Sequence, residues 1–197
     1  GSLVVNTNKN WSDVGASLPA QKIEVYGPPP TSGTRDAFVE MVMEAGCKEF
    51  PEFTKAIPDE KERKKACGLL REDGGYIDAG EDDNVVVQKL VSNKNALGIF
   101  GYSFLAENSS KVQGNKVEGV APTTQTIESG DYKVARILYI YVKGEHIGQI
   151  PGIAEFVQQM VSKDAVGTGG YLIAKGLLPL HADMQKKAVE AAAGLKK

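Results

Sequence analysis

The order of short β-prone runs and amphipathic helical runs is the feature that most limits the fold of this chain. The run KIEVYG at 22–27 alternates polar with apolar residues and ends at glycine, which predicts a short strand. Apolar residues then recur at helical spacing over 33–45, and Gly46 suits the end of that helix. The run KVARILYIYVK at 133–143 is β-branched and aromatic, and it is predicted to be the clearest strand. Strands that alternate with helices predict a layered α/β fold.

Most of the remaining chain is predicted to be helical or irregular. Residues 48–72 are rich in charge and predict two short helices broken at Pro58. The apolar, glycine-punctuated run 96–105 predicts a buried strand followed by a turn. The other predicted segments are irregular residues 1–20, a short helix at 84–93 with Asp83 or Asn84 at its start, a helix at 150–164 and an amphipathic helix at 181–195.

The composition narrows the class of protein. With 197 residues and 42% hydrophobic content, the chain can bury one substantial core or two modest ones. Its 23 Lys and Arg residues nearly balance 25 Asp and Glu residues, which argues against a nucleic-acid partner because such a partner needs a basic face. No apolar run approaches the roughly 20 residues that span a membrane. No signal peptide is recognised, but Gly1-Ser2 is typical of a tag remnant, so the N-terminus does not indicate a location.

The chain contains two cysteines, Cys47 and Cys67, and they fit no metal-ligand spacing. In the cytosol such a pair is expected to stay as two free thiols. In an oxidising compartment an isolated pair usually forms a disulfide. Composition alone leaves both states open.

The stretch GPPPTSGTRDAF at 27–38 holds the most informative turn of the sequence. Three prolines stiffen the approach to a small polar turn at the start of a predicted helix, where backbone N–H groups are unpaired and the helix dipole favours negative charge. Gly33 permits close approach of the backbone, the hydroxyls of Ser32 and Thr34 add donors, and Arg35 adds a charged fork. The turn therefore suits an oxyanion. The alternative is that Ser32 or Thr34 only caps the helix.

Catalytic and metal-binding patterns are missing from the sequence. Neither His146 nor His181 has a Cys, Ser or carboxylate pattern that marks a nucleophile or a metal site. The acidic run GEDD at 80–83 lacks the ligand spacing and terminal Glu of an EF-hand, and is predicted to be a solvated helix start. The run GTGGY at 167–171 lacks the lysine of a phosphate loop and a strand before it. The sequence therefore predicts no catalytic residue, no metal and no cofactor.

Four segments taken together resemble one protein family. In chain order they read PPTSGTRDAF, ALGIFGYSF, GDYKVARILYIYVK and FVQQMVSKDAVGTGGYLIAKGLLPL. This order resembles the phosphate-binding proteins of bacterial phosphate ABC transporters, which are type 2 periplasmic binding proteins. The likeness runs from about Trp11 to Leu180, and its most specific element is Ser-Gly-Thr entering a helix.

The resemblance implies two α/β lobes that close on phosphate like a clamp, with the Ser-Gly-Thr turn in the second lobe. Many members carry an arginine near this turn, in some several residues before the serine, where this chain has Pro28 and Pro29. Arg35 is then the expected charged contact, with Arg71 in reserve. The other ligands that the resemblance implies are Ser32, Gly33 and Thr34.

The chain departs from the family pattern because a long segment that normally precedes the turn, making most of the first lobe, is absent. The ligands of the first lobe would be absent together with this segment, including an acidic residue that accepts a proton from phosphate in the family. The expected fold is thus a type 2 periplasmic-binding-protein-like second lobe plus a C-terminal return segment. Its expected parts are a hinge-proximal segment at 1–20, the α/β domain with the anion-binding turn at 21–130, and a hinge strand with returning helices at 131–197.

The function implied by the resemblance is binding of inorganic phosphate for an ABC import system, in the periplasm, with delivery to a membrane permease. In that compartment Cys47 and Cys67 are expected to form a disulfide. The face that a missing lobe would cover is expected to cause self-association. Three alternatives stay open: a receptor for sulfate, molybdate or tungstate, a structural or sensory piece that binds nothing alone, and a phosphatase-like enzyme, for which no nucleophile is found.

Overall fold

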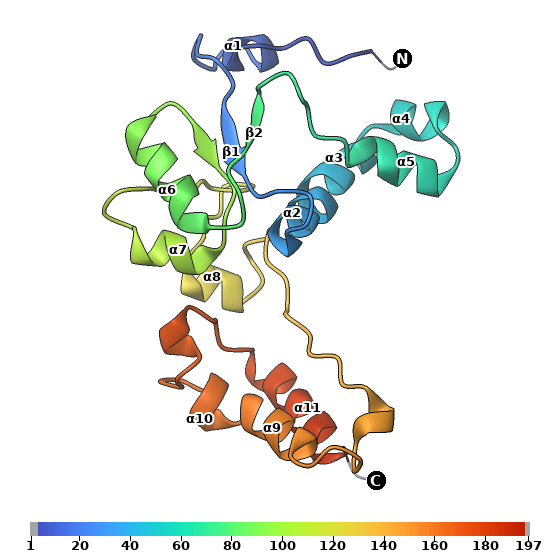
Figure 1. Cartoon of the computed structure of the whole chain (residues 1–197). Helices are drawn as coiled ribbons and strands as arrows, with labels where there is room; N and C mark the ends of the chain where they lie inside the picture. The colour runs from blue at the N-terminus through green and yellow to red at the C-terminus, as the bar shows by residue number, and fades with distance from the viewer. Residues whose placement is uncertain (1–3, 196–197) are drawn as a thin grey trace. The chain divides into compact units, whose positions relative to one another are not determined.

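The computed structural model describes residues 4–195 of the chain (Figure 1). The chain divides into two compact units, Gly1–Gln113 and Gly114–Lys197. Each unit is described by itself below. The predicted lobe boundary at residue 130 stays a prediction.

A three-stranded parallel sheet organises the first unit, with strand order β2-β1-β3 (Figure 1). The central strand β1 is Val25–Gly27, so the strand predicted at 22–27 is confirmed in its second half. The edge strands are β2, Tyr76–Asp78, and β3, Leu97–Gly98, both parallel to β1. Strand β2 was not predicted. The strand expected at 96–105 is much shorter than predicted, because helix α7, Tyr102–Glu107, begins soon after β3.

The helix after the candidate turn is longer than its sequence pattern predicts. It begins as α2, Gly33–Phe38, continues as a π-helical stretch η1, Val39–Glu44, and ends as α3, Ala45–Lys48. The three parts follow one another without a gap. The predicted helix over 33–45 is confirmed, and Gly46 lies inside it and does not end it.

Local capping residues explain the next helices of the first unit. Helices α4, Pro51–Ala56, and α5, Glu60–Cys67, flank Pro58, which confirms the predicted break. Helix α6, Asp83–Ser92, is capped by Asp82, one residue before the predicted start, since this carboxylate accepts the N–H of Asn84 at 2.9 Å. Residues 1–20 were predicted to be irregular, but they contain the short helix α1, Trp11–Val14.

The core of the first unit lies between α6 and the sheet. Helix α6 packs against β1 and β3. Its Val86 is 1% exposed, and a Cβ atom at Gly98 of β3 would lie only 2.7 Å from Leu90 Cδ1. This close approach needs a glycine on the strand. The buried residues of the first unit include Ile23, Pro28, Val86 and Val87.

Short helices build the second unit. The predicted helices at 150–164 and 181–195 are confirmed, the first as two helices separated near Ser162. Val157 and Ala192 are buried where α9 packs on α11. The elements of this unit are α8 (Thr124–Glu128), η2 (Gly144–His146), α9 (Ile153–Met160), α10 (Lys163–Val166), η3 (Ile173–Lys175) and α11 (Ala182–Ala193).

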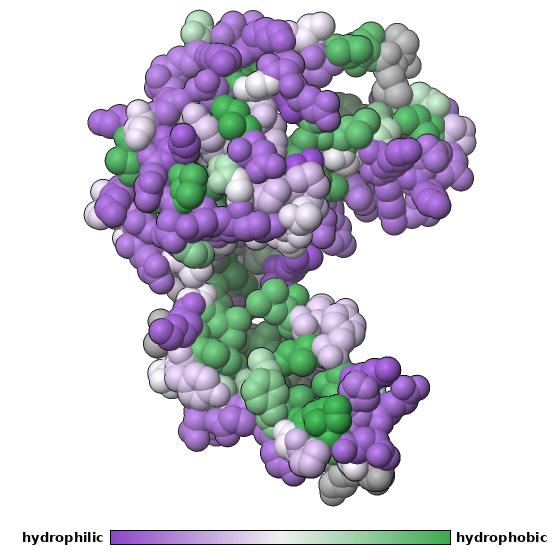
Figure 2. All heavy atoms as spheres, viewed as in Figure 1, coloured by the Kyte–Doolittle hydropathy of each residue, from purple (hydrophilic) through white to green (hydrophobic). Residues whose placement is uncertain are grey.

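The prediction of a strand at 133–143, the clearest one in the sequence, is wrong. These residues form no strand, and no other strand among residues 4–195 pairs with them. Their side chains lie in the open: Leu138 is 71% exposed and Tyr141 is 91% exposed. Strand propensity measures how well a residue fits a paired, half-covered surface, and the described chain gives this segment no such surface. Figure 2 shows further apolar side chains on the visible face of the second unit, around α9 to α11.

No helix of residues 4–195 is both long enough and apolar enough to cross a membrane.

Candidate anion-binding turn

Residues 32–35, here called the anion turn, follow directly from the central strand. Strand β1 ends at Gly27, and the prolines at 28–30 lead the chain to Ser32. Pro28 is fully buried, and the N–H of Ser32 donates to the carbonyl of Pro29 at 3.1 Å. A buried proline and a local hydrogen bond therefore hold the backbone that leads into the turn.

Ser32 caps the helix that follows. Its Oγ accepts the N–H of Thr34 at 3.2 Å, and its carbonyl accepts the N–H of Asp36 at 3.1 Å. The structure therefore decides between the two predicted caps in favour of Ser32. The cap uses an oxygen lone pair, and among the described residues no acceptor is found for the hydroxyl hydrogen of Ser32. Capping and donation to an oxyanion are thus compatible for this side chain.

The remaining turn residues present different groups. Gly33 is exposed and is the first residue of α2. Thr34 is half-buried. The helix that starts here runs on to Lys48, so its dipole places partial positive charge at the turn. The arrangement can stabilise a negatively charged ligand.

Arg35 leans onto an aromatic residue that the sequence did not single out. Its guanidinium carbon lies 5.4 Å from the ring centroid of Tyr76 in β2. The Tyr76 hydroxyl donates to the Pro28 carbonyl at 2.6 Å. Burial raises the pKa of the Tyr76 phenol, and the nearby Arg35 opposes that rise, so the phenol stays neutral and can donate. Tyr76 was missed because β2 is only three residues long and lies between glycines.

A carboxylate lies at the edge of the anion turn. The hydroxyl of Thr31 donates to Glu81 Oε1 at 2.5 Å. Glu81 belongs to the run at 80–83, which was predicted to be a solvated helix start, and its side chain is exposed as expected. Because the Thr31 hydroxyl is already engaged, it is not added to the donors of the turn.

Arg71, the reserve cation, is occupied elsewhere. Its Nε and Nη2 donate to the two carboxylate oxygens of Asp73 at 2.8 and 2.6 Å, and Nη2 also donates to the Asn8 carbonyl at 2.7 Å. Lys9 Nζ lies 2.7 Å from the same carboxylate. This network ties the N-terminal segment to the start of β2. Arg35 therefore remains the candidate charged contact.

Asp73 gives the first unit an acid-sensitive contact. Hydrogen bonds from Arg71, then from Lys9, hold the pKa of Asp73 well below its ordinary value. A depressed carboxyl pKa stabilises the folded state above the ordinary value of about 3.9, and this contribution is lost as pH falls from there through the folded pKa. Asp73→Asn is thus expected to lower the melting temperature by a few degrees at pH 7. The difference in melting temperature between variant and wild type should become smaller below pH about 3.9. Calorimetric melting of both proteins across pH checks this; a difference in melting temperature as large at about pH 2 as at pH 7 contradicts it.

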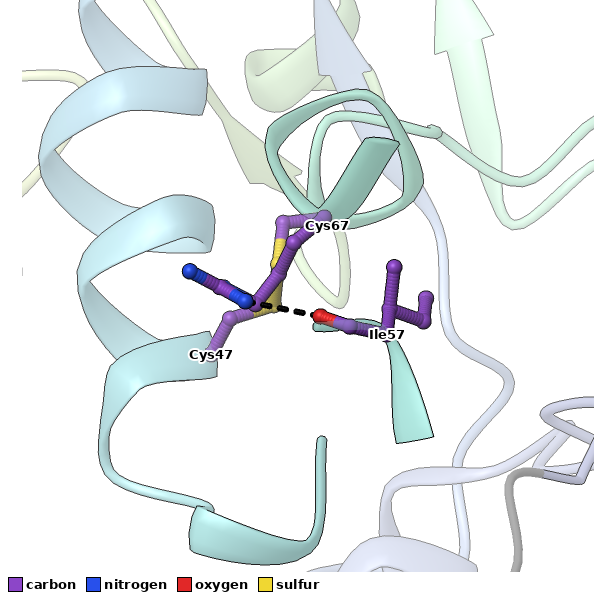
Figure 3. Close-up of a disulfide and its surroundings, with 4 residues drawn as sticks. Cys47, Ile57 and Cys67 are labelled. Atoms are coloured by element: carbon purple, nitrogen blue, oxygen red, sulfur yellow. Dashed lines mark hydrogen bonds between the residues drawn. A yellow bond between two sulfur atoms is a disulfide. The ribbon is translucent and has the colours of Figure 1, made fainter. Parts of the chain in front are cut away.

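The predicted disulfide between Cys47 and Cys67 is confirmed (Figure 3). It joins the end of the long helix to the end of α5 across 20 residues of sequence. Within this excursion, Arg63 Nη1 donates to the carbonyls of Ile57, drawn in Figure 3, and Pro58, at 2.7 and 3.0 Å. A hollow of about 140 Å³ lies beside the disulfide. Charges of both signs line it, including the ion pair of Lys64 and Glu60 at 3.1 Å.

Residues 4–195 contain no group of three or more His, Cys, Asp or Glu side chains placed to hold a metal ion.

Comparisons with known proteins agree on one family. A family model described as "PBP superfamily domain" matches residues 3–164. Phosphate-binding protein PstS of Staphylococcus saprophyticus is 31% identical over 155 residues, 76% of this chain and 40% of that protein. PstS of Staphylococcus haemolyticus is 32% identical over the same shares. The chain thus spans about 40% of the length of these relatives.

Two solved structures are similar. One is the crystal structure of a possible phosphate binding protein from Planctomyces limnophilus, with a TM-score of 0.61 and 28% identity over 97% of this chain and 60% of that chain. The other is PstS from Borrelia burgdorferi, with a TM-score of 0.53 over 89% of this chain and 59% of that chain. At 18% identity the second similarity concerns the fold alone.

Proposed function

The chain belongs to the PBP superfamily, and from this membership we propose that it binds inorganic phosphate as part of the substrate-binding component of an ABC phosphate importer. The observation that carries the proposal is the anion turn, in which Ser32 caps a long helix while its hydroxyl hydrogen faces no acceptor among the described residues. Relatives that align with the chain bear the name phosphate-binding protein, which supports phosphate as the ligand.

The proposed contacts follow from the chemistry of an oxyanion. Phosphate has several oxygens that accept hydrogen bonds, and the start of a helix offers N–H groups and positive potential together. In this proposal Gly33 lets the anion approach the helix start closely, Ser32 and Thr34 give hydroxyl donors, and Arg35 gives charge-assisted bonds. No bond of the ligand is made or broken, so the protein is a carrier and not an enzyme.

The remaining donors of a closed site would come from parts of the protein outside this chain. The chain spans about 40% of the length of its relatives, and a clamp needs ligands on both sides of the anion. We therefore expect this chain alone to bind phosphate much more weakly than the longer protein does. The periplasm and a membrane permease are the proposed location and partner, and the disulfide favours an oxidising compartment.

Self-association of this chain is expected through its exposed apolar run. Leu138, Tyr139 and Tyr141 are 71%, 69% and 91% exposed, and exposed apolar patches tend to mark contact surfaces. Sedimentation at rising concentration should show dimers, and Leu138→Lys with Tyr141→Lys should shift the protein toward monomer. A wild-type chain that stays monomeric across a wide concentration range would contradict this expectation.

Calorimetry tests the proposed ligand directly. Phosphate, sulfate and molybdate are titrated into this chain and into the longer protein. Binding of phosphate in preference to the other two supports the proposal. A preference for sulfate or molybdate would make the protein a receptor for another oxyanion, and no binding by either form would make the chain a structural or sensory piece.

A further inference from the structure

One side chain in β2 contacts both the approach to the anion turn and its cation. The Tyr76 hydroxyl donates to the Pro28 carbonyl at 2.6 Å, while its ring lies 5.4 Å from the guanidinium carbon of Arg35. Pro28 is fully buried, so its carbonyl depends on a partner inside the protein. The same phenol therefore supports the backbone before the turn and the charged side chain within it.

The end of the neighbouring strand is shaped to admit this phenol. A Cβ atom at Gly27 would lie 2.5 Å from the Tyr76 hydroxyl and 2.9 Å from two of its ring carbons. Any other residue at this position would have to push the ring away. Tyr76 stands opposite Val25 in the register of β1 and β2, so its side chain can reach along β1 past Gly27 to Pro28. The strand sequence and the tyrosine fit together.

A free arginine side chain adopts many conformations, and ordering it on a ligand costs affinity. A guanidinium that already lies on an aromatic ring is partly ordered before the ligand arrives, since cation and ring attract each other. From these contacts, and resting on the phosphate-binding function proposed above, we infer that Tyr76 is a positioning residue of the anion site: it holds Arg35 and the Pro28 backbone in place for the anion and does not touch the anion itself.

A double-mutant cycle tests this role. Tyr76→Leu is expected to weaken phosphate binding of the longer protein roughly tenfold when Arg35 is present, and only about threefold in an Arg35→Ala background, where the hydrogen bond to Pro28 is the one contact left to lose. Tyr76→Phe keeps the ring and should lose only about threefold. The matched control is Phe53→Leu, which shortens a half-buried aromatic side chain in α4 and should leave phosphate affinity unchanged. A purely structural role of Tyr76 predicts equal losses in both backgrounds, and that result would overturn the inference.

A second measurement decides the question even if Tyr76→Leu does not fold. In the nuclear magnetic resonance spectrum of the wild-type protein, the Nε–H proton of Arg35 should be shifted upfield by the Tyr76 ring and should move again when phosphate is added. An unshifted proton would overturn the inference while leaving phosphate binding intact. Absence of phosphate binding by the wild-type longer protein would instead overturn the proposed function, and the inference with it.

Discussion

Replacing Cys47 and Cys67 together by alanine is expected to lower the free energy of unfolding by about 3 kcal/mol, because a cross-link that closes a loop of this size restricts the unfolded chain. The excursion that the disulfide closes has little else to hold it. Phe50 is 63% exposed, and between residues 50 and 67 only Cys67 is buried. Denaturant titration of the wild-type and double-alanine proteins measures the difference.

The disulfide prediction has a control within the same excursion. Arg63→Met removes the two hydrogen bonds to the carbonyls of Ile57 and Pro58 but leaves the cross-link. It is expected to cost less than the double-alanine change, because water can replace the lost bonds at this partly solvated site, so that together they contribute only about 1 kcal/mol. Alanine is chosen because a serine at buried Cys67 would add an unpaired hydroxyl. A double-alanine protein as stable as wild type, or two free thiols in the unreduced denatured protein, would refute the prediction.

Elements defined by local chemistry could be predicted from the sequence, and elements defined by distant partners could not. The helix after the anion turn, the break at Pro58 and the terminal helix follow from periodicity and capping, and all are confirmed. The α/β class and the family are also confirmed. Segment 133–143 failed because its composition describes a strand, whereas a strand exists only where another strand pairs with it.

The same distinction holds for the candidate site: its residues that are neighbours in sequence could be predicted, and the residue that comes from a distant strand could not. Ser32, Gly33 and Thr34 are neighbours in sequence, so a turn before a helix could be read from their types alone. Tyr76 lies 44 positions after Ser32 in the sequence, and only the parallel pairing of β1 with β2 places it beside Arg35. Nothing local in GGYIDAG marks that tyrosine, because a three-residue strand has no clear alternation.

Removing single donors from the anion turn is expected to weaken phosphate binding of the longer protein by about 1.5–3 kcal/mol per bond, which is roughly tenfold or more in affinity. Ser32→Ala and Thr34→Val each remove one hydroxyl. Gly33→Val should weaken binding more, since a branched side chain blocks approach to the backbone N–H groups. Arg35→Lys should weaken binding less than Arg35→Ala, because charge remains while the planar fork is lost.

Measuring melting temperature and phosphate affinity on the same variants distinguishes helix capping from anion binding, because the two roles predict different combinations of these results. Ser32→Ala removes the cap as well, so it should lower the free energy of unfolding by about 1 kcal/mol, and with it the melting temperature, under either explanation. Ser32→Asp keeps a good cap but sets a carboxylate against the anion, so stability should hold while phosphate affinity collapses. Thr34 does not cap the helix, since the Oγ that accepts its N–H belongs to Ser32; its valine variant should therefore lose affinity with little change in melting. If Ser32→Asp and Thr34→Val both bind phosphate as wild type does, the turn is only a helix cap, and the anion must bind elsewhere.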